Sequence, residues 1–434
     1  MSPRIKKLAL GLTILIVGLG LAGVLWSVLH GGGPSGYAIA QSERKRQLAP
    51  QVDAVKLDAL VAGNTQFGLD LYRILRREGG NLFFSPYSIS LALAMVHAGA
   101  RGNTATEMAR ALHFTLEQDA LHPAFNVLDL DVAGLSDNPA VGGRLQLDIA
   151  NALWGQSGWS FLPEFLDVLA ENYGAGIQLL DLTGAPNEAR LIINEWVLRK
   201  TLGKIDSLLS PGAIGSLTEL VLTNAIYFNA TWEYRFDRRL TNSDGTFYPL
   251  DGRQVTVPMM EQLAPLGYAE GAGFRAVELP YCGEMLSMVA LLPDRERFEA
   301  FAEELDAERV DDLLDQIVRQ ERVHLRMPRF EFESGFRLGS ALTGLGMVTA
   351  FTEAADFSGM DGNHELFIGD VFHSAFVSVD EDGTEAGAST AVSMERSQPR
   401  VFTITLNRPF IFLIVHNKTR TVLFMGQVMD PREG

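Results

Sequence analysis

The stretch from Val377 to Arg400, VSVDEDGTEAGASTAVSMERSQPR, constrains the fold of this chain more than any other. It continues a run that alternates like a strand and then turns at Asp382-Gly383. Successive side chains of a strand point to opposite faces, and all the charge of residues 384–395 falls on one of them. The uncharged face holds Thr384, Ala386, Ala388, Thr390, Val392 and Met394. The segment can therefore lie in a sheet over a packed core, although its Gly, Ala and Ser content gives it little strand propensity.

This stretch has two other interpretations. Composition alone favours a flexible surface loop, because runs of small and polar residues are common in such loops. An acidic calcium loop is excluded: with Gly383 at its sixth position, Ser378 and Ser389 would be its first and last residues, and neither has a carboxylate. The rest of the chain must decide between a flexible loop and a segment that can form a strand but has not yet joined a sheet.

The N-terminus contains an apolar run from Leu8 to Leu29, preceded by three basic residues. Its 22 residues would span about 33 Å as a helix, roughly the hydrocarbon thickness of a bilayer. The run is longer than the usual signal-peptide core, although Ala38-Ile39-Ala40 is a suitable cleavage site. We favour an uncleaved anchor in residues 1–30 over a removed signal peptide. The basic residues predict export of everything that follows, to an extracellular or periplasmic compartment.

Composition and charge limit the remaining chain. The 36 basic and 53 acidic residues give a net charge of 36 minus 53, or -17, which argues against a nucleic-acid partner. The one cysteine, Cys282, allows no intramolecular disulfide, so the fold depends on its core. We expect a linker over residues 31–51, with its Glu43–Arg46 charge cluster, and one domain over residues 52–434, because no Pro/Gly/Ser linker divides that range.

Periodicity predicts helices in the first half and strands in the second, which indicates a mixed α+β fold. Pro86 opens a helix that Gly99 stops, and Thr104 with Glu107 is expected to form a capping box for the next one. Further helices are predicted over Leu57–Glu78, Glu188–Leu202 and Phe298–Val318. Strands are predicted over Leu145–Trp154, Thr218–Phe228, Val323–Phe332 and a hairpin, Pro409–Val428, that turns at Asn417 to Arg420.

Nine stretches, in a fixed order over nearly the whole chain after residue 52, resemble the serpin family. They are NLFFSPYSIS with GARGNT, INEWVLRKTLGKI, TELVLTNAIYFNATWEYRF, VTVPMM, VELPYCGEMLSM, MPRFEFES, LGM with ADFSGM, DEDGTEAGAST, and RPFIFLIVHNKTRTVLFMGQV. Each motif alone is weakly specific, but their order identifies the chain as a member of this family.

The resemblance implies a serpin fold with three β-sheets, of which a large one has five strands, and an exposed reactive-centre loop after Gly383. It also implies a metastable native state. A protease cleaves the loop and is still acyl-linked to it when the hinge side inserts as a new strand, which distorts the protease. The expected activity is therefore suicide inhibition of serine proteases by a monomer, with no cofactor and no metal.

The resemblance also assigns roles to individual residues. The hinge comprises Glu381, Gly383, Thr384, Glu385, Ala386, Ala388 and Thr390. The residues expected where the central sheet parts are Ser85, Ser88, Asn224 and His373, and Trp232 is expected with Glu381 near the point where the loop would insert. Ser374 departs from the family, which usually has lysine after the histidine, and this puts the local salt-bridge pattern in question.

The reactive bond has two candidate positions that differ by one residue. Family spacing from Glu381 places the specificity residue at Ser397, with cleavage before Gln398. Chemistry favours Arg396, because a guanidinium can pair with the carboxylate at the base of a trypsin-like pocket. We predict cleavage between Arg396 and Ser397 by trypsin-like proteases, with Ser397-Gln398 as the fallback for an elastase-like or subtilisin-like target.

Two other functional classes remain as rivals. A hydrolase is disfavoured, because the chain has no GxSxG and no HExxH motif. The closer alternative is a non-inhibitory serpin that acts as a carrier or chaperone. A bulky or charged residue on the inward face of the hinge would indicate that alternative, and the only charge between Thr384 and Val392 is Glu385, which points outward.

Overall fold

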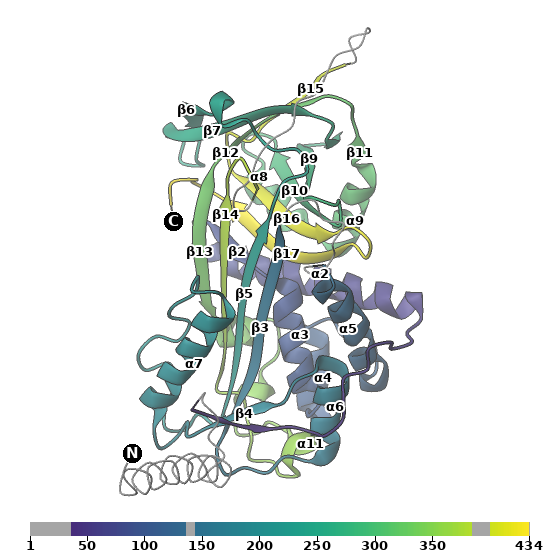
Figure 1. Cartoon of the computed structure of the whole chain (residues 1–434), viewed down its shortest axis with the longest axis vertical. Coiled ribbons are helices and arrows are strands. Elements are labelled where there is room, and N and C mark those ends of the chain that lie inside the picture. Colours follow the sequence, from purple (N-terminus) through teal and green to yellow (C-terminus); the bar gives the residue numbers. More distant parts are fainter. Residues whose placement is uncertain (1–35, 136–143, 384–399, 434) are drawn as a thin grey trace, which may run out of the picture.

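The computed structural model describes residues 36–135, 144–383 and 400–433. They form three sheets with helices packed around them, as the α+β prediction requires (Figure 1). No helix of the described residues is both long and apolar enough to cross a bilayer. The predicted anchor, Leu8 to Leu29, lies outside the described residues.

The two longest strands lie in a six-stranded sheet, whose long strands run along the long axis of the molecule (Figure 1). Its strands, in spatial order, are β1 (Ala38–Ala40), β4 (Ile177–Leu180), β3 (Leu145–Gln156), β5 (Leu220–Ala230), β14 (Asp370–Val379) and β13 (Phe330–Arg337). Every residue of β5 is buried, which agrees with the nearly continuous apolar pattern of Thr218–Phe228. β14 runs parallel to β5 and antiparallel to β13.

The sixth strand corrects two expectations. We expected five strands and a linker over residues 31–51, but β1 pairs with the edge strand β4 through Ala38, opposite Leu179. Arg46 then donates to Asn126 Oδ1 at 2.8 Å and pairs with Asp129 at 2.6 Å. Over residues 36–50 the segment is therefore docked on the domain, because its charges find carboxylates that lie far away in the sequence.

The second sheet has seven strands and contains the predicted C-terminal hairpin. The strands, in spatial order, are β11 (Val318–Arg319), β8 (Gly267–Gly271), β9 (Phe274–Pro280), β10 (Leu286–Pro293), β16 (Phe410–His416), β17 (Thr421–Val428) and β2 (Leu82–Phe84). β16 and β17 pair antiparallel, so the hairpin prediction is confirmed. Phe83 stacks on Phe424 with ring centroids 5.0 Å apart, which joins β2 to the hairpin within the core.

The third sheet lies at one end of the molecule (Figure 1). Its strands are β15 (Phe402–Thr405), β12 (Val323–Pro328), β7 (Val255–Ala264) and β6 (Asn242–Phe247). β15 is parallel to β12, with Phe402 opposite Val323. β15 begins soon after Arg400, so it is the first strand after the segment that contains the predicted reactive bond.

Helices cover both faces of the six-stranded sheet. The first group comprises α2 (Ala54–Leu75), α3 (Pro86–His97), α4 (Gly102–Ala111), α5 (Gln118–Ala133) and α6 (Pro163–Tyr173). α7 (Pro186–Lys200) lies on the other side of the sheet, where Trp196 packs edge-on against Trp154 of β3 (Figure 1). The remaining short helices are η1 (Arg76–Glu78), η2 (Arg238–Leu240), α8 (Phe298–Glu304), α9 (Ala307–Gln316), α10 (Gly339–Gly344), η3 (Thr349–Phe351) and α11 (Ser358–Asp361).

Local signals predicted some helix ends and missed others. α3 begins at Pro86, and the Ser85 hydroxyl accepts a hydrogen bond from the Ser88 amide at 3.1 Å, as an N-cap does. The Thr104 capping box is wrong, because Glu107 instead accepts hydrogen bonds from the amides of Val348 and Thr349. A tertiary contact therefore occupies the predicted capping partner.

The helix predicted over Phe298–Val318 is two helices, α8 and α9. The break falls at Asp306, whose carboxylate accepts from the Arg309 amide at 2.8 Å. Aspartate at this position satisfies a free helix amide, so it starts a new helix instead of continuing the old one.

Candidate functional site

The chain reverses direction directly after β14, at the turn that the sequence predicts. The Trp232 amide donates to Asp382 O at 3.0 Å, and its indole nitrogen donates to Asp380 O at 3.0 Å. Gly383 has φ +131°, and a Cβ at this position would lie 2.3 Å from Ala230 O. Only glycine can approach the end of β5 so closely. The structure therefore brings Trp232 and the start of the hinge together, as the resemblance implies.

Glu381 is fully buried beside this turn. Its carboxylate accepts hydrogen bonds from Arg329 Nε at 2.9 Å and from the Thr241 hydroxyl. Burial acts to raise the pKa of this carboxyl, but hydrogen bonds from Arg329 and Thr241 outweigh it and lower the pKa overall. Glu381 is thus held as a carboxylate, and the pair joins the end of β14 to the loop between β12 and β13.

Sequence reasoning missed Arg329 and Thr241 as partners of Glu381. Arg329 lies inside the MPRFEFES stretch, but nothing local shows that it faces a carboxylate 52 residues later. A second cation, Arg238, pairs with Asp382 and lies 3.6 Å from Asp380. Two arginines from elements far away in the sequence therefore offset part of the charge of the three carboxylates in this turn.

The four residues expected where the sheet parts form one buried network. His373 Nδ1 lies 2.5 Å from Asn224 Oδ1, and its Nε2 accepts from the Ser85 amide at 3.3 Å. The Asn224 amide nitrogen donates to the Ser88 hydroxyl at 2.5 Å. Because the Ser85 amide can only donate, His373 Nε2 must be the unprotonated nitrogen, which makes the ring neutral. The network connects β5, β14 and α3.

Asn151 is a member of this network that the sequence did not reveal. It stands opposite Asn224 in the β3–β5 register, and its side-chain oxygen accepts from both Asn224 and the Ser88 hydroxyl. His373 is in turn opposite Asn224 across β14 and β5. One row of side chains therefore crosses three strands, and only strand register could have identified Asn151.

Burial determines the charge state of this network. His373 is fully buried and its pKa is lowered to about 3 by desolvation. Its ring also lies parallel to Phe336, with centroids 6.3 Å apart. A neutral imidazole fits this setting, because a charged one would be buried without a carboxylate partner.

Ser374, where the resemblance expects lysine, donates a hydrogen bond to a carboxylate without adding a positive charge. Its hydroxyl donates to Glu333 Oε1 at 2.8 Å, across the β13–β14 pair. A hydrogen bond between neighbouring strands therefore takes the place of the expected salt bridge.

The rest of the predicted hinge and the predicted reactive bond lie outside the described residues. They are Thr384, Glu385, Ala386, Ala388, Thr390, Arg396, Ser397 and Gln398. The described residues on either side of this segment are Gly383, which follows β14 and lies beside the end of β5, and Arg400, which precedes β15. The structure thus places both ends of the segment on the domain.

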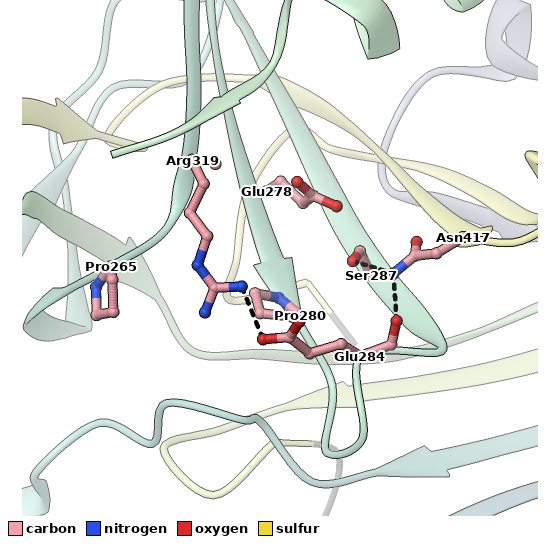
Figure 2. A pocket seen from close by; sticks show the side chains of 8 residues that line it. Pro265, Glu278, Pro280, Glu284, Ser287, Arg319 and Asn417 are labelled. Atoms are coloured by element: carbon pink, nitrogen blue, oxygen red, sulfur yellow. Dashed lines mark hydrogen bonds and ion pairs between the residues drawn. The ribbon is translucent and has the colours of Figure 1, made fainter. Parts of the chain in front are cut away.

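A polar pocket of about 90 Å³ lies at the edge of the seven-stranded sheet (Figure 2). Arg319 pairs with Glu284 at 2.8 Å, and the Asn417 amide donates to the Ser287 hydroxyl at 2.9 Å. It is lined by Pro265, Gly267, Glu278, Pro280, Glu284, Ser287, Arg319 and Asn417. Several of its polar groups satisfy one another and its volume is far below that of ordinary ligand sites, so it is not a substrate pocket.

Comparisons with known proteins agree with this arrangement. Residues 62–431 match a family model described as Serpin (serine protease inhibitor). An uncharacterized serpin-like protein of Thermococcus kodakarensis is 40% identical over 374 residues, which cover 85% of each chain. The leukocyte elastase inhibitor of Homo sapiens is 37% identical over 391 residues, covering 86% of this chain and all of that protein.

Solved structures give the same result. Tengpin, a thermophilic serpin in its native state, superposes with a TM-score of 0.80 at 29% identity and covers 91% of this chain and 99% of its own. Human thyroxine-binding globulin, solved in a complex with thyroxine, has a TM-score of 0.76 at 29% identity, and the match covers 87% of this chain and 99% of that one.

Proposed function

Because this chain belongs to the serpin family of serine protease inhibitors, we propose that it traps serine proteases as a suicide substrate. It is an inhibitor and not an enzyme, as its relatives named for elastase inhibition indicate. The protease serine attacks the carbonyl carbon of the residue before the reactive bond. An acyl-enzyme forms and the new amino terminus leaves. Insertion of the cleaved hinge then distorts the active site of the protease, so water no longer hydrolyses the acyl bond.

The observation that carries this proposal is the pairing of β5 and β14. These strands are parallel, and the chain reverses at Asp382-Gly383 directly after β14. A strand continuing from Gly383 between them would run antiparallel to both and would complete backbone hydrogen bonds on each side. Its core-facing residues would be the uncharged set that begins at Thr384, so no unpaired charge would enter the sheet.

The network of His373, Asn224 and Ser88 supports a gating role for these residues. Its hydrogen bonds cross from β14 to β5 and to α3, so a new strand between β5 and β14 must break the bond from His373 to Asn224. We propose that this network holds the sheet closed until the loop is cut. Trp232 and Glu381 would hold the end of the sheet where the hinge begins.

For the reactive bond we propose Arg396-Ser397 and a trypsin-like target, with Ser397-Gln398 as the fallback. Arginine suits a trypsin-like pocket, because its guanidinium can pair with the carboxylate at the base of that pocket. The leukocyte elastase inhibitors among the relatives give the fallback an elastase-like candidate. From the apolar run at residues 8–29 we also propose that the domain acts outside the cytoplasm, held at the membrane if the run is not removed.

The test is to mix the purified domain with trypsin, elastase and subtilisin. The expected result is a complex that survives boiling in detergent, together with a released C-terminal fragment that begins at Ser397. A fragment that begins at Gln398 would move the reactive bond by one residue. The matched variants are Arg396→Ala, which should abolish trapping of trypsin, and Ser397→Ala, which should preserve it.

The alternative function is that of a non-inhibitory carrier or chaperone. It predicts that every protease that cuts the loop is released active, with no covalent adduct and no rise in the melting temperature of the cleaved domain. That result would overturn the inhibitory proposal.

A further inference from the structure

Four arginines surround β15, the strand that follows the proposed reactive bond. They are Arg275 on β9, Arg295 after β10, Arg400 and Arg408. Within the described part of the chain, none of the four lies within ion-pair distance of a carboxylate, whereas Arg238, Arg319 and Arg420 each do. Other surface arginines of the described residues, such as Arg77, also lack an ion pair, so what these four share is their position around β15.

Neutral groups hold these side chains in place. Arg275 donates to Thr403 O at 3.3 Å, and Arg408 donates to Pro293 O at 3.0 Å. The Arg400 guanidinium lies 4.6 Å from the centroid of the Phe402 ring. Carbonyl oxygens and aromatic rings orient a guanidinium but do not cancel its charge. The positive charges therefore remain available to a partner.

The arginines are close enough to influence one another. The pKa of Arg408 is lowered first by burial and then by repulsion from Arg275 and Arg295, with Asp294 opposing. Glu270 lies opposite Arg275 in the β8–β9 register. Glu296 follows Arg295, and Glu321 precedes Arg322, whose carbonyl oxygen accepts from the Phe402 amide, so further carboxylates share this surface. The four guanidinium groups, which have no ion pair among the described residues, form one cluster around β15. We call it the β15 patch.

The place of the β15 patch indicates which partner meets it. Arg400 follows Ser397 by three residues, which span at most about 11 Å. A protease bound at the reactive bond covers on the order of 800 Å² of its partner, so its surface reaches Arg400 and β15. Arg295 and Arg400 are exposed and therefore free to contact it.

We propose that the β15 patch is an accessory docking surface for the target protease, and that the protease it fits carries carboxylates beside its active-site cleft. The proposal rests on the inhibitory function proposed above. A protein partner suits the patch better than a linear polyanion. Polyanion binding depends on many phosphate-like or sulfate contacts along a basic track, whereas here four cations are interspersed with Asp294 and Glu270.

Charge complementarity of this kind acts mainly on the rate of association and is weakened by salt. The test compares an anionic and a cationic trypsin, which share a preference for arginine but differ in surface charge. The second-order rate of inhibition is measured at several NaCl concentrations. We expect the anionic trypsin to be inhibited about tenfold faster at low salt, and this preference to fade as salt rises.

The variant is Arg275→Gln combined with Arg295→Gln, which removes two charges but no carboxylate partner. We expect it to lose about tenfold in rate toward the anionic trypsin at low salt, with an unchanged number of inhibitor molecules used per protease. The control is Lys56→Gln combined with Arg77→Gln, which removes two exposed charges from α2 and η1. It should leave the rate unchanged.

Two results would overturn the patch proposal. One is equal rates and equal salt dependence for the variant and the control. The other is a loss of heparin binding in the variant while the protease rates stay the same, which would assign the surface to a polyanion.

A trypsin whose catalytic serine is replaced by alanine distinguishes failure of the inhibitory function from failure of the patch proposal. If no active protease forms an adduct, the inhibitory function fails by itself. The salt-dependent affinity of the inactive anionic trypsin, and its loss in the variant, still decides the role of the β15 patch.

Discussion

Phe376 of β14 lies directly opposite Tyr227 of β5, and this is the last registered pair between the two strands. Beyond it, β5 continues to Ala230 beside β3, and β14 continues to Val379 beside β13. The sheet has therefore already parted above this pair. The Lys204 ammonium lies 5.7 Å from the Tyr227 ring centroid and 5.5 Å from that of Phe376. One cation therefore contacts both strands at this junction of β5 and β14, which we call the seam.

We expect the Lys204→Met variant to convert faster to an inactive form with the uncut loop inserted. Each cation–π contact contributes about 0.5–1 kcal/mol, so losing both should weaken the closed seam by about 1–2 kcal/mol and speed conversion about five- to thirtyfold. The measurement is the loss of inhibitory activity during incubation at a fixed raised temperature. Lys200→Met is the matched control, because its ammonium lies 5.9 Å from the Trp196 ring on α7 and not on the seam. Equal rates for the two variants would contradict a role for Lys204.

Removing Arg329 should destabilise the domain more than neutralising Glu381. Arg329→Gln leaves the fully buried Glu381 carboxylate without its cation, which typically costs about 3–5 kcal/mol. Glu381→Gln removes the charge itself and should cost less. Thermal unfolding of both single variants and of the double variant is the measurement. The double variant should melt near Glu381→Gln, and the opposite order would show that the carboxylate is not charged in the native state.

Stability should fall as the pH is lowered from about 6.5, the usual pKa of an unfolded histidine. Burial lowers the pKa of His373 and of His122 to about 3 in the folded state, so between these values the unfolded chain binds more protons. Stability is thus fully present above pH 6.5 and is lost progressively toward pH 3, by up to about 1.4 kcal/mol per pH unit for each histidine. Melting temperatures from pH 7 to pH 5 measure this.

His373→Gln should reduce the pH dependence of stability by the contribution of one histidine. The control is His364→Gln, because the His364 side chain is 71% exposed. A slope that is the same in His373→Gln and in the parent protein would mean that His373 is not buried as a neutral ring.

Two arginine substitutions on opposite faces of the hinge strand can test which face enters the sheet. Thr384→Arg should leave the loop cleavable but block insertion, because the arginine would enter the core face unpaired. Glu385→Arg, one residue later and on the outward face, should keep trapping the protease. Detergent-stable complex formation distinguishes the two. The cleaved parent and the cleaved Glu385→Arg should also melt far above their intact forms, and the cleaved Thr384→Arg should not. Trapping by Thr384→Arg would show that the assignment of the faces is reversed.

The sequence alone determined the features whose signals are local. The apolar run of β5, the hairpin of β16 and β17, and the start of α3 at Pro86 follow from periodicity and capping within a few residues. The order of the motifs identified the family, and the family implied the meeting of Ser85, Ser88, Asn224 and His373. The same residue-by-residue reasoning placed Trp232 beside Glu381.

Only the tertiary structure decided which distant groups complete these sites. Asn151 joins the buried network through the register of β3 on β5, and Arg329 reaches Glu381 across 52 residues. The docking of residues 36–50 and the place of Lys204 over the seam also depend on contacts between remote segments. Hydrophobic pattern and capping act between neighbours along the chain, whereas strand register and buried charge pairing are set when segments pack. The sequence therefore determined the central strands of the large sheet, and packing decided which edge strand joins it and which distant side chains complete its buried network.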